Sequence, residues 1–95
     1  MLGSDVLVVS LRRRSQFEIM AEILNLCRQP QTRTRVSMET CLSWKTSDRY
    51  LSYLLERKFL ETHHSRIEYV TAEKGHEFLI RWIALVRLLP EARAA

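Results

Sequence analysis

The sequence predicts an α+β fold that is mostly helical and forms one small domain. The chain has 95 residues, of which 46% are hydrophobic, and this suffices for one modest core. It contains two glycines and two prolines, a scarcity that favours long helices joined by short turns. Hydrophobic residues recur at three- and four-residue spacing in several segments, and they alternate with polar residues around residues 59–70.

A first helix is expected over residues 15–28. Ser15 and Glu18 have the spacing of a capping box, in which each side chain satisfies a backbone N–H of the first turn. Pro30 sets the end of this helix, because the residue before a proline is pushed out of helical geometry. The hydrophobic stripe of the helix, which should face the core, consists of Phe17, Met20, Ala21, Ile23, Leu24, Leu26 and Cys27.

A second and a third helix are expected after a polar link over residues 29–33. The second helix is short, over residues 35–41, with Thr34 as its N-cap. After a tight two-residue connection, Ser43 can cap the third helix over residues 44–58. The hydrophobic side of the third helix consists of Tyr50, Leu51, Leu54 and Leu55.

The remaining elements are a β-hairpin and a last helix. Hydrophobic and polar residues alternate over residues 59–70 on either side of a polar tip at residues 63–66, as in a two-stranded hairpin. Thr71 is the expected N-cap of the last helix, and Glu73 lies in its first turn, where the helix dipole favours an anion. The helix is expected to run to Leu89, which a proline follows.

This order of elements is that of a winged helix-turn-helix. In such a domain the second helix braces the third across a short turn, so that the third can place its polar face in the major groove of duplex DNA. We therefore divide the chain into an N-terminal arm (1–13), a winged helix-turn-helix DNA-binding domain (14–71), a long C-terminal dimerisation helix (72–89) and a tail (90–95).

The candidate DNA-binding residues are cationic, hydroxyl or phenolic side chains on the third helix, beside it and at the hairpin tip. Arginine and lysine can donate to guanine, and serine and threonine can contact bases or phosphates. Arg66 at the hairpin tip suits a phosphate or the minor groove. Arg33 and Arg35 lie near the start of the second helix, where backbone donors also attract phosphate. The set is Arg33, Arg35, Lys45, Thr46, Arg49, Ser52, Tyr53 and Arg66.

Several of these positions have a plainer interpretation. Lys45 and Arg49 could simply be solvated on an exposed helix face. Asp48, on the same face, could accept from cytosine or orient Arg49. Trp44, at the helix start, is interpreted as a hydrophobic anchor rather than a base-stacking group. The arginine run at residues 12–14 could be a phosphate clamp, a minor-groove arm or a solvated leader.

Charge and motif content favour a binding protein over an enzyme. The chain carries 15 lysines and arginines against 11 acidic residues, a net charge of +4 that mildly favours a polyanionic partner. It has no nucleophile elbow, no glycine loop for phosphate and no carboxylate pair beyond helix-surface glutamates. We therefore expect no catalytic activity.

The cysteines and histidines do not have metal-ligand spacing. Cys27 and Cys41 belong to no CxxC pair and are interpreted as two buried free thiols. His63 and His64 are interpreted as turn residues, so no metal or other cofactor is expected. The hydrophobic stretch at residues 6–9 is too short for a membrane span, and a cytoplasmic protein without membrane contact is the default expectation.

The last helix is hydrophobic on three sides, and a single small domain would cover only one of them. An exposed surface of this kind usually marks a partner interface. We therefore expect a homodimer, although the helix could instead pack within its own domain or touch a membrane surface. The predicted interface residues are Phe78, Leu79, Trp82, Ile83, Leu85, Val86 and Leu89.

Several short motifs match one known family. The most specific are the Leu42-Ser43-aromatic turn and the sequence Thr-x-Glu-Lys-Gly over residues 71–75. Further matches lie at residues 19–26, Thr34, Tyr50-Leu51, residues 54–57, Leu60 and Tyr69-Val70. With them, residues 14–89 resemble archaeal winged-helix DNA-binding proteins, predicted transcriptional regulators that include chromatin-associated coiled-coil dimers.

The resemblance implies a winged-helix fold, duplex DNA as a partner and a last helix that pairs with its copy in a dimer. The chain departs from the family at Lys58, where glycine is usual, so Lys58 should adopt left-handed geometry unless the turn differs. It departs again at Ser47, where an aliphatic residue is usual, and in a wing tip that lacks glycine. A DNA-binding regulator or architectural protein is the first hypothesis, and a winged-helix protein-interaction module is the alternative.

Overall fold

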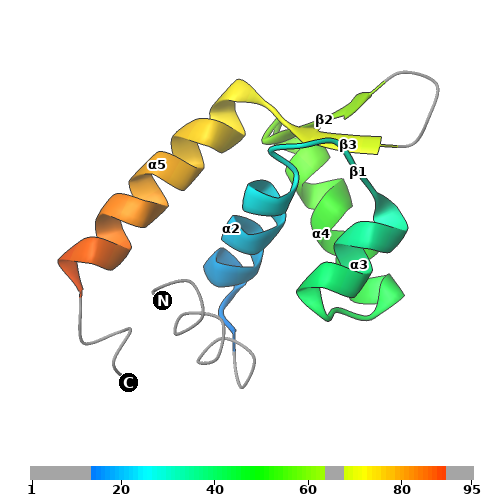
Figure 1. The fold of residues 1–95 in the computed structure, drawn as a ribbon, viewed down its shortest axis with the longest axis horizontal. Coiled ribbons are helices and arrows are strands. Elements are labelled where there is room, and N and C mark those ends of the chain that lie inside the picture. The colour runs from blue at the N-terminus through cyan, green and yellow to red at the C-terminus, as the bar shows by residue number, and fades with distance from the viewer. Residues whose placement is uncertain (1–13, 64–67, 90–95) are drawn as a thin grey trace.

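The computed structural model describes residues 14–63 and 68–89. In chain order, these form α2 (Gln16–Leu26), β1 (Gln31–Thr32), α3 (Arg33–Thr40), α4 (Trp44–Glu56), β2 (Leu60–His63), β3 (Glu68–Thr71) and α5 (Glu73–Leu88) (Figure 1). The predicted fold class is confirmed, since helices dominate and the strands form one small antiparallel sheet.

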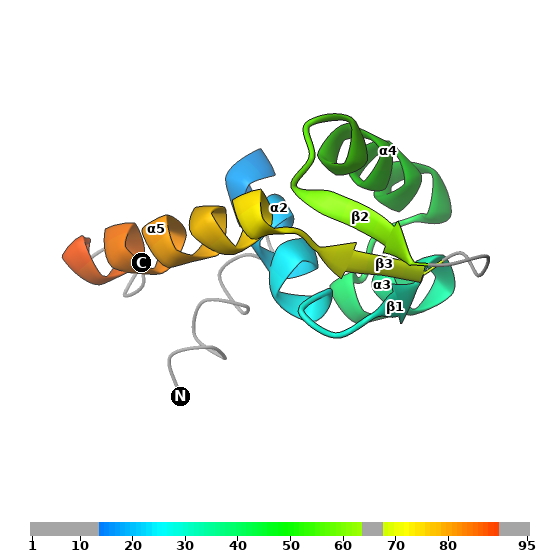
Figure 2. The same cartoon turned by 90° about the horizontal axis from the view of Figure 1, so that it is seen from above.

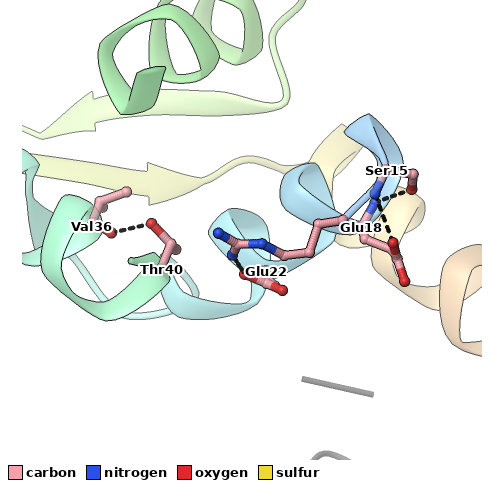
Figure 3. A network of polar contacts seen from close by, with 6 residues as sticks. Ser15, Glu18, Glu22, Val36 and Thr40 are labelled. Atoms are coloured by element: carbon pink, nitrogen blue, oxygen red, sulfur yellow. Dashed lines mark hydrogen bonds and ion pairs between the residues drawn. The ribbon is translucent and has the colours of Figure 1, made fainter. Parts of the chain in front are cut away.

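The capping box predicted for the first helix is present. The Ser15 hydroxyl accepts from the backbone N–H of Glu18 at 3.1 Å, and the Glu18 carboxylate accepts from the backbone N–H of Ser15 at 2.7 Å (Figure 3). α2 ends at Leu26, before the proline that was expected to stop it. Most of the predicted stripe is buried, but Phe17 is 58% exposed, so its assignment to the core was wrong.

The segment predicted as a polar link contains a strand and the start of α3. β1 pairs antiparallel with β3, with Gln31 opposite Tyr69. α3 begins at Arg33, and its N-cap is Thr32, whose hydroxyl accepts from the backbone N–H three residues on at 3.2 Å. The predicted cap, Thr34, was therefore wrong. Strand pairing holds Thr32 in the extended conformation that an N-cap requires.

A tight turn joins α3 to α4. Cys41 lies at its start in left-handed geometry, with φ of 57°, and its side chain is exposed. Only Cys27 is buried, so the prediction of two buried thiols was wrong for Cys41. The Ser37 hydroxyl donates to the carbonyl of Leu42 at 2.8 Å and closes the turn. Ser43 then caps α4, as predicted.

The sheet has the strand order β1-β3-β2, so β3 lies in the centre. The connection from α4 to β2 passes through Lys58, which has φ of 68°, and this confirms the left-handed geometry expected there. β2 and β3 form the predicted hairpin, with Leu60 opposite Thr71 and His63 opposite Glu68. The hairpin tip lies outside the described residues.

Thr71 closes the sheet onto α2 instead of capping α5. Its hydroxyl donates to the carbonyl of Leu24 at 2.6 Å and its backbone N–H donates to the carbonyl of Cys27 at 2.8 Å. The N-cap of α5 is Ala72, which has no side-chain cap, so the prediction of Thr71 as cap was wrong. The first turn of α5 lies very close to this junction, because a Cβ on Gly75 would be 2.3 Å from the carbonyl oxygen of Phe59.

The core lies where α2, α3, α4 and the sheet meet. Ile23, Leu24, Val36 and Leu54 are fully buried there, and Leu79 joins them from the first half of α5. Trp82 still packs against this core, and toward its C-terminal end α5 diverges from the rest of the domain (Figure 2). The core thus fixes the outward face of α4 and leaves the distal part of α5 largely uncovered.

Candidate nucleic-acid interface

The exposed face of α4 carries most of the predicted reading residues. Ser47, Leu51 and Leu54 are at most 1% exposed and hold the opposite face against the core. Because α4 has 3.6 residues per turn, this burial turns the intervening positions outward. The exposed members are Lys45, Arg49, Ser52 and Tyr53, and Thr46 is half-buried beside them.

Ser47 occupies an inner position, as the family resemblance implied. Its side chain is fully buried, and its hydroxyl donates to the carbonyl of Trp44 at 3.1 Å. Thr46 is partly engaged as well, because its hydroxyl accepts from the Ser43 hydroxyl at 3.0 Å. Lys45 and Arg49, the two cations of α4, are both exposed.

Arg33 does not extend freely from the start of α3. Its guanidinium pairs with Asp48 at 3.1 Å, donates to the Tyr69 hydroxyl at 3.0 Å and lies 5.5 Å from the ring centroid of Trp44. The hydrogen bond with Tyr69 raises the pKa of Arg33 above its already high ordinary value. Arg33 thus ties α3, α4 and β3 together, a role that its position in the sequence did not indicate.

The contacts of Arg33 also account for Trp44 and Asp48. Trp44 is 52% exposed and lies under the guanidinium, so the prediction that it is a hydrophobic anchor was wrong. The Asp48 carboxylate faces Arg33, so its negative charge is balanced within the domain. The outward face of α4 therefore presents Lys45 and Arg49 beside an Asp48 whose charge is already paired.

The other candidate cations differ in their surroundings. Arg35 is exposed and pairs with Glu39 at 3.4 Å, a surface ion pair of small net stability. Arg14, the last residue of the arginine run, forms an ion pair with Glu22 of α2. Its side chain is 9% exposed, so it packs against its own domain. Arg66 at the hairpin tip lies outside the described residues.

The predicted dimer-interface residues are not all on one surface of α5. Leu79 is 7% exposed and packs into the core of its own domain. Phe78 and Trp82 are half-buried and stacked, with ring centroids 6.4 Å apart, and Val86 is half-buried as well. The large exposed hydrophobic residues of α5 are Ile80, Ile83, Leu85 and Leu88, and its C-cap Leu89 is also exposed.

Three members of this hydrophobic surface are absent from the predicted interface. Ile80 and Leu88 are 68% and 75% exposed, although they had been left out of the predicted interface. Phe17 of α2 lies beside α5, where it lines a shallow groove of about 280 Å³ with Phe78, Arg81, Trp82 and Leu85. The uncovered surface thus includes the start of α2. The periodicity of hydrophobic residues in the sequence could not reveal this, because Phe17 has the spacing of a core residue.

The described residues offer no sign of a metal centre. Within residues 14–63 and 68–89, no three histidine, cysteine, aspartate or glutamate side chains gather closely enough to hold a metal ion. In the same part of the chain, no helix has the length and hydrophobicity needed to cross a membrane.

A helix with an exposed polar face, braced by a shorter helix and followed by a β-hairpin, defines the winged helix-turn-helix class. A family model described as winged helix-turn-helix matches residues 13–88, and the chain belongs to this family. The chain is also 30% identical over 57 residues to an uncharacterised protein of Methanocaldococcus jannaschii. This match covers 59% of each chain, so our chain spans about three-fifths of that relative's length.

Proposed function

We propose that the protein is a DNA-binding transcriptional regulator or architectural protein, rather than an enzyme, and that α4 enters the major groove of a duplex. The observation that carries this proposal is the outward face of α4. It combines two solvent-facing cations, Lys45 and Arg49, with hydrogen-bonding side chains at Ser52 and Tyr53. Side chains of these types can read base edges or contact phosphates from a helix in that groove.

Electrostatics supports the same assignment. Asp48 would repel phosphate if its charge were free, but Arg33 lies 3.1 Å from it. The charges of these two residues sum to zero. On the outward stripe of α4, Lys45 and Arg49 then outnumber the exposed Glu56, and the face keeps a positive excess. Arg35, at the first turn of α3, adds a cation that can exchange Glu39 for a phosphate.

A homodimer through α5 is the second part of the proposal. The exposed hydrophobic residues of α5, together with Phe17, form the kind of surface that a partner usually covers. A second copy would remove this surface from water and place two α4 helices on one molecule. Two linked reading helices bind a duplex more tightly than one, because the second contact is intramolecular.

The test compares variants of α4 in fluorescence anisotropy with labelled duplex DNA. Arg49→Ala and Lys45→Ala should each weaken binding about tenfold, the loss expected for one charge-assisted contact. Arg87→Ala is the matched control, since it removes the same charge from the distal end of α5, and it should bind like the unchanged protein. If Arg49→Ala and Lys45→Ala bind the duplex as tightly as Arg87→Ala does, the placement of α4 on DNA is contradicted.

The alternative is a winged-helix module that binds another protein through the same face. Exposed Trp44 and Tyr53 on α4 are the residues that favour it, because aromatic side chains are enriched in protein interfaces. The same anisotropy assay distinguishes the two functions. A protein-interaction module would show no affinity for duplex DNA even at low salt.

A further inference from the structure

A cavity of about 370 Å³ lies between the first half of α2 and the middle of α4. Small-molecule sites in proteins typically have volumes of about 300–1,000 Å³. The wall is formed by Gln16, Phe17 and Met20 of α2 and by Arg49, Tyr50 and Tyr53 of α4. The cavity therefore reaches the reading face of α4 at Arg49 and is large enough for a small organic molecule.

The lining combines one cation with an aromatic, mostly uncharged wall. Met20 is 6% exposed and belongs to the buried core, whereas Phe17 and Tyr53 are 58% and 42% exposed. No acidic side chain is among the described residues that line the cavity. The site thus offers a hydrophobic inner side, aromatic rings at the rim and one guanidinium.

The guanidinium of Arg49 has no carboxylate partner among the described residues. The same holds for Arg28, Arg57 and Arg87, and Arg57 instead lies 4.9 Å from the ring centroid of Tyr53. Among the described residues, Arg14, Arg33, Arg35 and Arg81 each pair with a carboxylate, and Arg49 is not in this group. A planar guanidinium fork matches a carboxylate with two parallel hydrogen bonds. Aromatic rings meet other aromatic rings favourably in stacked or edge-to-face arrangements.

We propose that this cavity binds a small aromatic carboxylate. Its ring packs against Met20 and the rings of Phe17 and Tyr50, and its carboxylate accepts hydrogen bonds from Arg49. A second consequence rests on the proposed function. Because the carboxylate and DNA would use the same guanidinium, the bound ligand lowers the affinity for DNA, and the protein is regulated by the molecule it binds.

The direct test is a titration of the full chain with 2-naphthoate, in which binding is monitored through the NMR chemical shifts of the backbone amides. The neutral analogue 2-naphthalenemethanol has the same ring system without the charge. Naphthoate should produce saturable shifts at residues 16–20 and 49–53, with an affinity at least about tenfold above that of the alcohol. Equal affinities, no saturation, or shifts confined to α5 around Trp82 would overturn the proposal.

Two variants identify the groups involved. Arg49→Gln should weaken naphthoate at least about tenfold and leave the alcohol unchanged, because it removes only the charged contact. Phe17→Ala should weaken both molecules, and Phe17 is exposed enough to be replaced without loss of the core. Arg87→Gln, which lies outside the cavity, is the control for a lost charge. An Arg49→Gln protein that binds naphthoate normally would overturn the assigned role.

The link to DNA is measured separately. In duplex anisotropy, naphthoate should raise the apparent Kd while the alcohol should not. Naphthoate bound at the cavity with an unchanged Kd for DNA would overturn the regulatory part of the proposal. A chain that binds naphthoate but no duplex at any salt concentration would refute the proposed function and leave the cavity assignment standing.

Discussion

Single residues set the charge of the α4 face. Arg33, Asp48 and Tyr69 come from three different elements, and their contact makes one guanidinium serve as a bridge within the domain. Under the proposed function, a cation used in this way should contribute less to DNA binding than its exposed neighbours. For this reason Arg49 and Lys45, rather than Arg33, are the residues on which binding should depend most.

The two cysteines should differ sharply in reactivity. Burial raises the pKa of the Cys27 thiol to about 12, so at neutral pH almost none of it is the reactive thiolate. Cys41 is exposed in the turn after α3. Iodoacetamide at pH 7.5, followed by mass spectrometry, should label Cys41 alone, and Cys27 only after unfolding. Labelling of Cys27 at a comparable rate in the folded protein would contradict its burial.

Glu22 should make stability depend on pH. Burial raises the pKa of Glu22 above its ordinary value, against the opposing attraction of Arg14. The folded state therefore holds the Glu22 proton more tightly than the unfolded chain. The associated stability is present below the ordinary pKa and is lost as pH rises through the raised value.

The measurement is urea unfolding of the unchanged protein and of Glu22→Gln between pH 4 and pH 7. The unchanged protein should lose stability relative to the variant as pH rises, because only it carries a carboxyl that must ionise in a buried site. Glu77→Gln, at an exposed ion pair, serves as the comparison. A relative stability that rises with pH would mean that the attraction of Arg14 dominates.

At the level of elements, the cap of α3 gives a matched pair of variants. Thr32→Ala removes the hydroxyl that accepts the first-turn N–H and should cost about 1 kcal/mol of unfolding free energy. Thr34→Ala removes a similar hydroxyl two residues away and should change stability by a few tenths of a kcal/mol at most, since alanine is the better helix former. Urea midpoints that reversed this order would place the cap at Thr34.

The helix caps also separate the features that the sequence alone predicts from those that it does not. The Ser15 and Ser43 caps were predictable because their causes are local, whereas the left-handed geometry at Lys58 was expected from the family resemblance, in which glycine is usual there. Thr32 and Thr71 were not, because their conformations depend on β1 pairing with β3 and on the carbonyl of Leu24 in a distant helix. The spacing of residues within one segment of the sequence does not predict contacts with distant segments.

In the candidate site, too, the features with a local cause were predictable and those that depend on distant contacts were not. The outward direction of Lys45 and Arg49 followed from the hydrophobic period of α4, which the core confirms. The bridge from Arg33 to Tyr69 spans 36 positions in sequence and has no local signature. The wall that Phe17 forms beside α4 and α5 was missed for the same reason, since its spacing assigned it to the core.

For the whole molecule, the extension of α5 away from the domain is the dominant feature (Figure 2). Ile83→Asp places a charge on its exposed face at a residue that is 47% exposed, so the fold of one protomer should survive. We expect the unchanged protein to have the mass of a dimer in light scattering at micromolar concentration and Ile83→Asp to have that of a monomer, because a buried unpaired carboxylate is costly. His76→Asp, exposed in the first turn of α5, should remain dimeric.

The most direct test of the central claim is the salt dependence of binding to a random-sequence duplex, measured by fluorescence anisotropy. Contacts between arginine or lysine and phosphate release counterions, so binding must weaken as salt increases. We predict measurable affinity at about 50 mM salt and a loss of at least about tenfold by about 200 mM, as several phosphate contacts imply. No binding at low salt, or an affinity that does not change with salt, would contradict the assignment of α4 as a DNA-reading helix.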